Sequence, residues 1–536
     1  MTCQGKQAEK ALEALMHTFT ALMQEDKEVK TVQKEEAFYE GGFIEGDIIS
    51  DGIAVAPAYR YKETMVQKDS GLTFQEAVNK SLDELETLYT SQQRNSDSGI
   101  YLAQKELLSS LQTKTHTFQD FKMLIEQSFS ELSGTKLEAK ISDYKDLLQR
   151  VEKHLGLEIE AHFPDKPFIL LADDLLPSQI EQLTRTPVAG VILKETSVNS
   201  HVAILLRGAG IPSLIADTSL LTEETNIIVD AYSGMVVISP TQADLGKAQN
   251  RLEKDARQKA LASEKRFDSA QTKKGKRIKV LANVTDVNSA RNSKEEGAQG
   301  IGLLRTEFLF KEEKPSFAMQ VKAYEKIFAH FDDITVRTLD VGGDKALPYI
   351  RLPKENNPFL GIRGIRLFQS HPEIMEEQLH AIFTAAKSKP LKVMFPMVSS
   401  VAEFQEAKAF AKATAKKYQV DISQIHFGIM VEVPSVLFSL DAFNEVVDFY
   451  SIGTNDLGQY LFAIERTHPT LKVDETSSVL FDAIDTIIKK AVKPVSICGE
   501  LASNKQAIPK LLALGIETLS VSPKSIAQTK EEIRNV

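Results

Sequence analysis

From residue 276 onward, short strand-like runs alternate with longer helical stretches about eight times. This alternation strongly constrains the fold, because parallel strands must be joined by a crossover that is usually a helix. The pattern predicts an α/β architecture with a (β/α)8, or TIM, barrel, and a doubly wound sheet is the competing fold. The expected strands are 277–283, 301–305, 334–340, 391–396, 426–432, 446–453, 494–500 and 518–522.

Arginines and acidic residues recur at or just after the ends of successive expected strands. A barrel of this kind has its active site at the carboxyl ends of the strands, so these side chains are candidates for one site. Singly, a strand-end arginine also fits a structural ion pair, and a strand cysteine fits a buried small hydrophobe. The candidates are Arg305, Arg337, Asp340, Arg363, Glu432, Asn455, Asp456, Arg466, Cys498 and Glu500.

The chemistry of these candidates points to a small anionic ligand. Arginine forks suit carboxylate and phosphate oxygens. Glu432 and Asp456 are hard oxygen ligands, and two carboxylates together with substrate oxygens commonly hold Mg²⁺. Cys498 could protonate a carbon atom. We therefore expect a phospho-carboxylate bound with Mg²⁺.

A second candidate site lies upstream, in residues 196–212. His201 falls in the first turn of an expected helix whose apolar run, 202–206, forms the buried face, with Ser197 or Asn199 as the N-cap. A helix N-terminus offers free N–H groups to an anion, so the imidazole could carry a phosphoryl group there. The residues expected to end the helix are Gly208, Gly210 and Pro212.

The remaining sequence divides by composition and periodicity. No proline lies between Pro57 and Pro164, a segment with several amphipathic helical stretches, and strand-like runs follow it. The helical module therefore looks inserted into an α/β domain whose first piece, 46–60, reads as a β-hairpin. The expected divisions are 1–24 (strand end and helix), 25–45 (linker), 46–65 with 165–241 (α/β domain), 66–164 (helical module), 242–275 (helical linker) and 276–536 (barrel).

Charge and cysteine usage limit the function classes. A net charge of −10 argues against sequence-independent nucleic-acid binding, which needs a basic face. No run approaches the roughly 18 apolar residues of a membrane span. The two cysteines, Cys3 and Cys498, do not form a disulfide framework, and the N-terminus lacks the apolar core of a signal peptide, so we expect a cytoplasmic protein.

Several long motifs follow one another in the expected barrel. They are A-N-V (282–284), E-G-A-Q-G-I-G-L-L-R-T-E-F-L-F (296–310), V-R-T-L-D-V-G-G-D-K (336–345), N-P-F-L-G-I-R-G-I-R (357–366), M-F-P-M-V (394–398), G-I-M-V-E-V-P (428–434), S-I-G-T-N-D-L (451–457) and I-C-G-E-L-A (497–502). By these motifs residues 46–536 resemble Enzyme I, the phosphoenolpyruvate–protein phosphotransferase family of the bacterial sugar phosphotransferase system. The resemblance implies that His201 is the phosphorylated histidine of a swivelling domain and that the helical module docks the phosphocarrier protein HPr. The relatives act as homodimers through the barrel, which we expect here too.

The resemblance also implies roles in the barrel. Glu432 and Asp456 would hold Mg²⁺, and Cys498 would protonate enolpyruvate to pyruvate. The residues that would bind phosphoenolpyruvate are Arg305, Arg337, Lys345, Arg363, Asn455, Asp456 and Arg466.

Some features depart from the family or leave alternatives open. Thr196 and Ser197 stand where the family has Gly-Gly, and Leu176 replaces a hydroxyl residue, so the setting of His201 is altered. Residues 1–24 are similar to the last strand and helix of HPr, as in an HPr–Enzyme I fusion, or form an unrelated helical extension. A phosphoenolpyruvate-sensing regulator stays open as an alternative. A relative of phosphoenolpyruvate synthase or pyruvate phosphate dikinase would need a nucleotide-grasp domain, for which the chain leaves no room.

Overall fold

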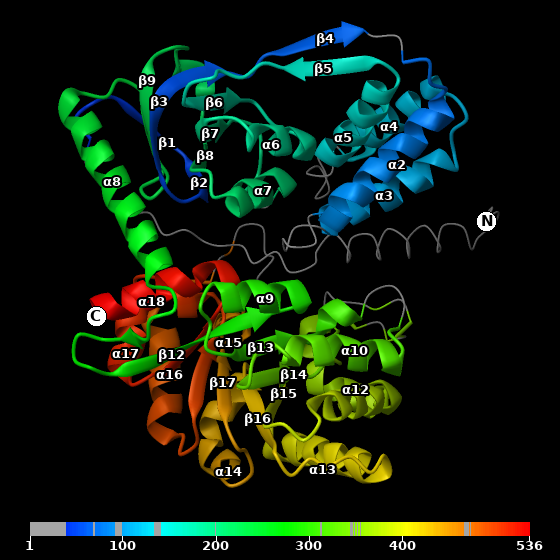
Figure 1. The fold of residues 1–536 in the computed structure, drawn as a ribbon, viewed down its shortest axis with the longest axis vertical. Helices are drawn as coiled ribbons and strands as arrows, with labels where there is room; N and C mark the ends of the chain where they lie inside the picture. The colour runs from blue at the N-terminus through cyan, green and yellow to red at the C-terminus, as the bar shows by residue number, and fades with distance from the viewer. Residues whose placement is uncertain are drawn as a thin grey trace. The chain divides into compact units, whose positions relative to one another are not determined.

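The computed structural model describes residues 39–536, apart from 68–69, 92–98, 133–140, 199, 311–313, 343–346, 348, 351, 354, 466–470 and 472. The described chain forms two compact units, one that ends at Ala256 and one that runs from Arg257 to Val536 (Figure 1). The expected 1–24 piece, most of the 25–45 linker, Asn199, Lys345 and Arg466 lie outside the described residues. Among the helices that are described, none is long and apolar enough to cross a membrane.

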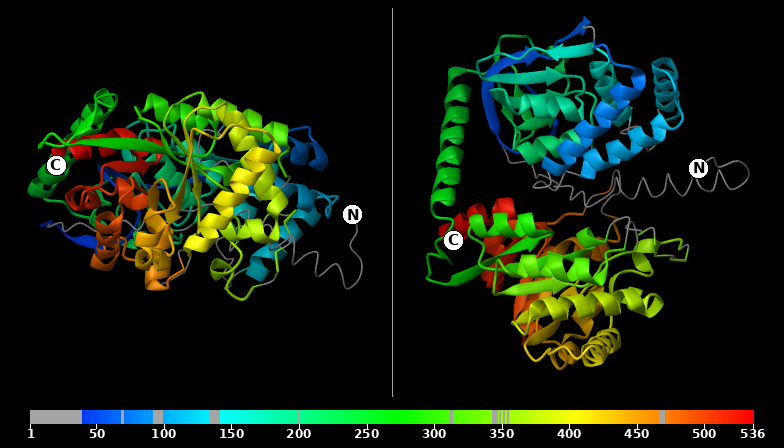
Figure 2. Two further views of the ribbon diagram at one scale, coloured as in Figure 1. Left: turned by 90° about the horizontal axis from the view of Figure 1, so that it is seen from below. Right: turned by 45° about the vertical axis from the view of Figure 1, so that its right-hand side comes forward.

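The unit from Arg257 onward is built on a closed barrel of parallel strands (Figure 2). Strands pair in chain order, and the first also pairs with the last, with Val280 opposite Leu519. This closing pair confirms the barrel and excludes the open doubly wound sheet, which keeps two free edges. The barrel strands are β12 (Arg277–Val284), β13 (Ile301–Arg305), β14 (Ile334–Arg337), β15 (Leu391–Phe395), β16 (Ile425–Val431), β17 (Tyr450–Gly453), β18 (Val495–Cys498) and β19 (Thr518–Val521).

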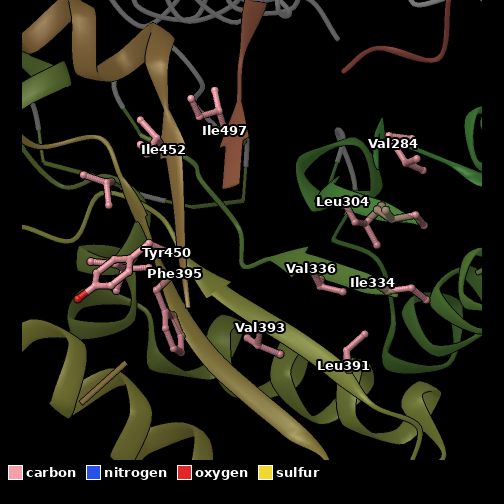
Figure 3. Packing of buried hydrophobic residues seen from close by; sticks show 14 of the residues in the cluster. Val284, Leu304, Ile334, Val336, Leu391, Val393, Phe395, Tyr450, Ile452 and Ile497 are labelled. Carbon is pink, nitrogen blue, oxygen red and sulfur yellow. The ribbon is translucent and has the colours of Figure 1, made fainter. Parts of the chain in front are cut away.

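The barrel strands are apolar along most of their length because both of their faces are covered. In β16 only His426 is exposed. Figure 3 shows Val336, Val393 and Phe395 among the side chains of this core. The helices of the unit are α9 (Val287–Glu295), α10 (Phe317–Phe328), α11 (Leu367–Ser370), α12 (Pro372–Ala386), α13 (Val401–Lys417), α14 (Leu440–Asn444), α15 (Thr454–Phe462), α16 (Ser478–Lys490), α17 (Ala507–Leu514) and α18 (Ile526–Asn535).

The other unit contains a mixed sheet in the order β1-β10-β9-β3-β6-β7-β8-β2, in which β3, β6, β7 and β8 run parallel. The expected hairpin at 46–60 is wrong: β2 pairs with β8, whereas β3 pairs with β9 and β6. Both segments find partners far away in sequence, which local turn signals cannot reveal. The strands are β1 (Phe43–Glu45), β2 (Asp47–Ser50), β3 (Ile53–Arg60), β6 (Phe168–Ala172), β7 (Val188–Leu193), β8 (Ser213–Ile215), β9 (Asn226–Asp230) and β10 (Met235–Val237). Helices α6 (Pro177–Leu183) and α7 (His201–Ala209) belong to the same domain.

A helical module interrupts this domain between β3 and β6. It is entered through β4 (Glu63–Gln67) and left through β5 (Leu157–Ala161), which pair antiparallel as a two-stranded ribbon. Its helices have a core of their own, which includes Leu85, Leu108 and Phe121. The helices are α2 (Phe74–Ser91), α3 (Gly99–Gln112), α4 (Phe118–Leu132) and α5 (Ile141–His154).

The segment that links the two units begins as helix α8 (Gln242–Glu264). The helix ends short of residue 275, the end expected from the sequence. The following short strand β11 (Ala270–Gln271) pairs antiparallel with β12, so the last part of the expected linker joins the barrel sheet.

Candidate active site

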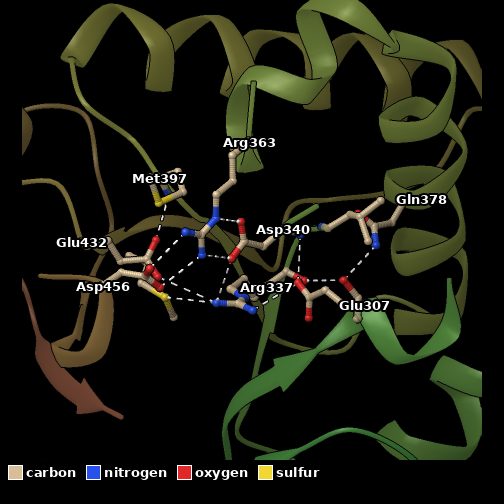
Figure 4. A network of polar contacts seen from close by, with 11 residues as sticks. Glu307, Arg337, Asp340, Arg363, Gln378, Met397, Glu432 and Asp456 are labelled. Atoms are coloured by element: carbon tan, nitrogen blue, oxygen red, sulfur yellow. Dashed lines mark hydrogen bonds and ion pairs between the residues drawn. The ribbon is translucent and has the colours of Figure 1, made fainter. Parts of the chain in front are cut away.

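The carboxyl ends of the barrel strands bring polar side chains together at one end of the barrel. Arg305 ends β13, Arg337 ends β14, and Cys498 ends β18. Glu432 directly follows β16, and Asp456 lies in the first turn of α15, just after β17. Parallel strands end on the same side of a sheet, which explains why residues far apart in sequence meet here. Figure 4 shows the resulting polar network.

Arg363 joins two buried carboxylates in this network. Its Nε and Nη2 atoms donate to Oδ1 and Oδ2 of Asp340, each at 3.0 Å. Its Nη1 and Nη2 atoms donate to Oδ1 and Oδ2 of Asp456 at 3.0 and 3.2 Å. Burial alone would lower the pKa of the Arg363 guanidinium, but the two carboxylates outweigh it and raise that pKa well above its ordinary value. The side chain therefore carries a permanent positive charge.

Arg337 lies beside a second set of acids. Its Nη2 atom donates to Glu307 Oε1 at 3.2 Å, and Nη1 lies 3.5 Å from Asp340 Oδ2 and 3.8 Å from Glu432 Oε1. Two buried atoms here, Arg337 Nε and Glu307 Oε2, have no hydrogen-bond partner among the described residues. Buried polar atoms are rarely left unpaired, so these two have capacity for a ligand or for water.

Glu432 is almost completely buried, and its Oε2 atom accepts a hydrogen bond from the backbone N–H of Met397 at 2.9 Å. Burial, followed by the nearby charges of Asp456 and Asp340, raises the pKa of Glu432 despite the opposing effect of the arginines. The raised pKa means that the nearby arginines do not fully compensate the negative charge of the buried Glu432 carboxylate. A cation bound beside Glu432 would supply the missing positive charge.

The donor set fits Mg²⁺. In the network the carboxylates of Glu307, Asp340, Glu432 and Asp456 outnumber the guanidinium groups of Arg337 and Arg363. Among the described residues, no group of three or more His, Cys, Asp or Glu side chains could hold a metal ion alone. Mg²⁺ commonly takes one or two protein carboxylates and completes its shell with water and substrate oxygens. Two carboxylates, such as those of Glu432 and Asp456, would therefore be enough protein ligands for this ion.

Cys498 holds a protonated thiol at the end of β18. Its Sγ atom accepts from Ser451 Oγ at 3.4 Å and donates to the carbonyl oxygen of Ile452 at 3.5 Å. Burial raises the pKa of this thiol to about 11. The thiol therefore keeps its proton near neutral pH, as a general acid must.

Asn455 is fixed by the residues that follow Cys498. Its Oδ1 atom accepts from the backbone N–H of Glu500 at 3.2 Å. Gly499 has a φ of 114°, and a Cβ atom there would lie 2.4 Å from Thr454 Oγ1 and 2.9 Å from Asn455 Oδ1. Only glycine fits at this position, which sets the place of Asn455 beside the thiol-bearing strand.

His201 is the first residue of α7, in the unit that ends at Ala256. The N-cap is Ser200, whose Oγ atom accepts from Ala203 N at 3.2 Å, so the expectation of Ser197 or Asn199 as the cap is wrong. Thr196 Oγ1 lies 2.9 Å from Ser200 Oγ, so this departure from the family touches the cap directly. At the other end, Gly210 adopts the left-handed conformation, with a φ of 68°.

The structure adds two residues that sequence reasoning missed. Glu307 accepts from Arg337 and also from the backbone N–H of Asp340, at 2.8 Å. Gln378, on α12, donates to Thr306 Oγ1 at 3.0 Å and accepts from Leu339 N at 2.9 Å, which ties the ends of β13 and β14 together. Glu307 carried a sequence signal, because it lies two residues beyond the strand-end Arg305. Gln378 carried none.

Comparison with known proteins gives the family. Residues 259–536 match the PEP-binding domain of PEP-utilising enzymes, where PEP is phosphoenolpyruvate, and residues 164–234 match the mobile domain of the same enzymes. A multiphosphoryl transfer protein of Rhodobacter capsulatus is 32% identical over 100% of this chain and 70% of its own length. Phosphoenolpyruvate-protein phosphotransferases of Staphylococcus carnosus and Bacillus subtilis are each 33% identical, over 92% and 90% of this chain and 94% and 93% of theirs. The chain therefore belongs to the family of PEP-utilising enzymes.

Proposed function

We propose that this protein is a phosphoenolpyruvate–protein phosphotransferase. It transfers the phosphoryl group of phosphoenolpyruvate to His201 and from there to the histidine of an HPr-type carrier in sugar uptake. The observation that carries this proposal is the cluster of buried arginines and carboxylates at the carboxyl end of the barrel. Its guanidinium groups suit the oxygens of a phospho-carboxylate, its carboxylates suit a metal cation, and two relatives bear this activity as their name.

The arginines bind the substrate. Arg305, Arg337 and Arg363, with Lys345, Asn455 and Arg466, hold the phosphate and carboxylate oxygens. Arg337 Nε is buried and unpartnered in the described structure, which supports its use for a ligand oxygen. Catalysis of phosphoryl transfer comes mainly from positioned cations. They stabilise the negative charge that the transition state spreads over the equatorial oxygens of the transferring group.

Glu432 and Asp456 would hold Mg²⁺. When bound, the ion neutralises the charge that develops on the transferring phosphoryl group. The excess of carboxylates over guanidinium groups around Glu432 supports this assignment.

The transfer is a covalent relay. A ring nitrogen of neutral His201 bonds to phosphorus while the bond between phosphorus and the enol oxygen breaks. The Cys498 thiol gives its proton to the methylene carbon of the leaving enolate, which becomes pyruvate, and solvent reprotonates the thiolate. The raised pKa of Cys498 supports the acid role. His201 then moves to the carrier, which the match of residues 164–234 to a mobile domain supports.

The remaining features concern partners and location. We place the HPr-type carrier on the helical module of α2–α5 and expect a homodimer through the barrel. Exposed apolar side chains in the loops after β14 and β16, Leu360 and Phe438, support a partner surface there, Phe438 being 90% exposed. A reducing cytoplasm suits the free thiol of Cys498.

Labelled phosphoenolpyruvate tests the proposal. Incubation with Mg²⁺ should put acid-labile label on the wild-type chain and none on His201→Ala. Label should also be lost without Mg²⁺ or in Glu432→Ala, because the barrel can then no longer donate the phosphoryl group. Subsequent addition of HPr should remove the label from the chain. Label that persists in His201→Ala would refute the assignment, and label that HPr cannot remove would favour a sensor of phosphoenolpyruvate.

A further inference from the structure

We propose that Arg363 is an internal counter-cation that competes with Mg²⁺ for Asp456, so that metal binding depends on the substrate. The phosphate of phosphoenolpyruvate draws the guanidinium away from Asp456, and Asp456 is then available to the metal. This inference rests on the proposed function and on Asp456 as a metal ligand. It adds to that function an order of binding, in which phosphoenolpyruvate binds first and thereby makes Asp456 available to the metal.

The first support is the way in which Asp456 is occupied. Both of its carboxylate oxygens accept from Arg363, Oδ1 at 3.0 Å and Oδ2 at 3.2 Å. A guanidinium that contacts both oxygens neutralises the charge of the carboxylate and occupies one acceptor position on each oxygen, about half of those that a metal could use. Asp456 is thus a poor metal ligand as long as Arg363 stays in this position.

The second support is that Arg363 has another acid to hold it. Its Nε and Nη2 atoms donate to Asp340, each at 3.0 Å. An arginine that loses its only partner inside a protein leaves an uncompensated buried charge, which is strongly destabilising. Because Asp340 remains, Arg363 can give up Asp456 without becoming unpaired. The exchange also leaves each charge beside an opposite charge, since phosphate replaces Asp456 beside Arg363 and the metal replaces Arg363 beside Asp456.

The third support is that the main chain around Arg363 is held in place. Tyr460 OH donates to the carbonyl oxygen of Phe359 at 2.6 Å. Arg366 Nη1 donates to the carbonyl oxygens of Leu360 and Gly361, each at 3.2 Å. The exchange is therefore a movement of the Arg363 side chain and needs no rearrangement of the loop.

Competition has a consequence that a simple substrate-binding role lacks. If Arg363 only bound substrate, its removal would leave metal affinity in the absence of substrate unchanged. If Arg363 only supported the fold, its removal would weaken the metal site. Under competition, removal tightens metal binding without substrate and reduces the gain that substrate brings to the part that its own oxygens contribute as metal ligands. Coupling of this kind is reciprocal, so the metal must tighten substrate binding to the same extent.

The test measures Mn²⁺ affinity of the full chain by electron paramagnetic resonance, with and without phosphoenolpyruvate. The wild type should bind Mn²⁺ weakly alone and about tenfold more tightly with substrate, within the usual range of coupling between sites. Arg363→Met should bind Mn²⁺ about tenfold more tightly than the wild type without substrate and show a smaller further gain with it than the wild type does. Arg363→Lys, which keeps the charge but cannot contact both acids through a planar fork, should fall between the two.

Two further variants control the measurement. Arg291→Met removes an exposed arginine of the same unit, on α9, that contacts Asn288 and no carboxylate of the network, so Mn²⁺ affinity should change less than about twofold. Asp456→Asn in the Arg363→Met background should abolish the tight site, which assigns the gain to Asp456. Circular dichroism and thermal unfolding establish that each variant is folded. If Arg363→Met does not fold, the Mn²⁺ affinity of Arg363→Lys without substrate tests the competition instead.

The outcomes separate the inference from the function on which it rests. If Arg363→Met and Arg363→Lys bind Mn²⁺ no more tightly than the wild type without substrate, the competition is refuted. Labelling of wild-type His201 in the same preparation would leave the phosphotransferase proposal standing. If the wild type neither takes up label nor binds Mn²⁺ with substrate present, the proposed function fails and the inference fails with it.

Discussion

A buried thiol keeps its proton at a pH at which an exposed thiol loses it, and Cys498 is such a thiol. Burial raises its pKa to about 11, so the thiol stays protonated across the physiological pH range. Replacement by alanine should lower the rate of pyruvate formation by about 100-fold, because a positioned acid contributes on that order. Affinity for phosphoenolpyruvate should stay near the wild-type value.

The pH profile gives a second measure of the same role. Since the acid must be protonated to act, and its pKa is raised, turnover should not fall through loss of the thiol proton until the pH approaches 11. Rates of pyruvate release from pH 7 to 10, compared between wild type and Cys498→Ala, give the answer. Equal rates for the two proteins, or a decline centred near pH 8.5 in the wild type alone, would contradict the assignment.

At the residue scale, the sequence predicts where the charged side chains gather but not which of them form ion pairs with one another. The strand ends predicted where Arg337, Glu432 and Asp456 would gather, because parallel strands end on one side. The partner of each charge could not be predicted, since Arg363 meets Asp456 across 93 positions of sequence. The contacts of Gln378 could not be predicted for the same reason. Its hydrogen bonds to Thr306 and Leu339 form only when α12 packs near the ends of β13 and β14.

Helix α7 depends on a cap, Ser200, that lies directly before His201, the proposed phosphoryl acceptor. Ser200 Oγ accepts from Ala203 N and is 7% exposed, so alanine would leave a buried N–H without its partner. Ser200→Ala should lower the free energy of unfolding by about 1 kcal/mol. Urea unfolding followed by circular dichroism measures the loss.

Ser197 provides the matched control, because it is a nearby serine whose side chain does not cap the helix. Ser197→Ala should change the free energy of unfolding by roughly 0.5 kcal/mol or less, as expected for an exposed substitution. A larger effect from Ser197→Ala than from Ser200→Ala would show that the cap has been assigned to the wrong serine.

At the element scale, the pattern of the sequence predicted the strands of both units, but it predicted the strand partners correctly only in the barrel. The barrel strands were recognisable because each is apolar, short and separated from the next by a helix. Segments 47–50 and 53–60 were also recognisable as strands, but the two-residue connection between them imitates a hairpin. Their real neighbours, β8 for one and β9 and β6 for the other, are set by tertiary packing.

The whole chain carries separate hydrophobic cores on either side of residue 256. One large core fills the barrel unit, and smaller cores fill the sheet domain and the helical module. Scanning calorimetry should therefore show at least two transitions. Phosphoenolpyruvate with Mg²⁺ should raise only the barrel transition, by about 2.7 kcal/mol of stability at a hundred times the dissociation constant.

The variant Arg337→Met serves as the control for this experiment, because it removes a proposed substrate contact and should abolish the shift. A single transition, or equal shifts of all transitions with ligand, would show that the two units unfold as one cooperative body.

The ribbon of β4 and β5 bears on how a chain of this kind can be assembled over evolution. Glu63 lies opposite Ala161 in the ribbon, so the chain leaves the sheet domain and returns to it at neighbouring points. The inserted module, almost a hundred residues long, can therefore be gained, lost or exchanged as one unit. Such an exchange would interrupt no strand of the eight-stranded sheet. The proposed recognition of a carrier by the helical module and the proposed chemistry at His201 could then diverge separately, each within its own part of the chain.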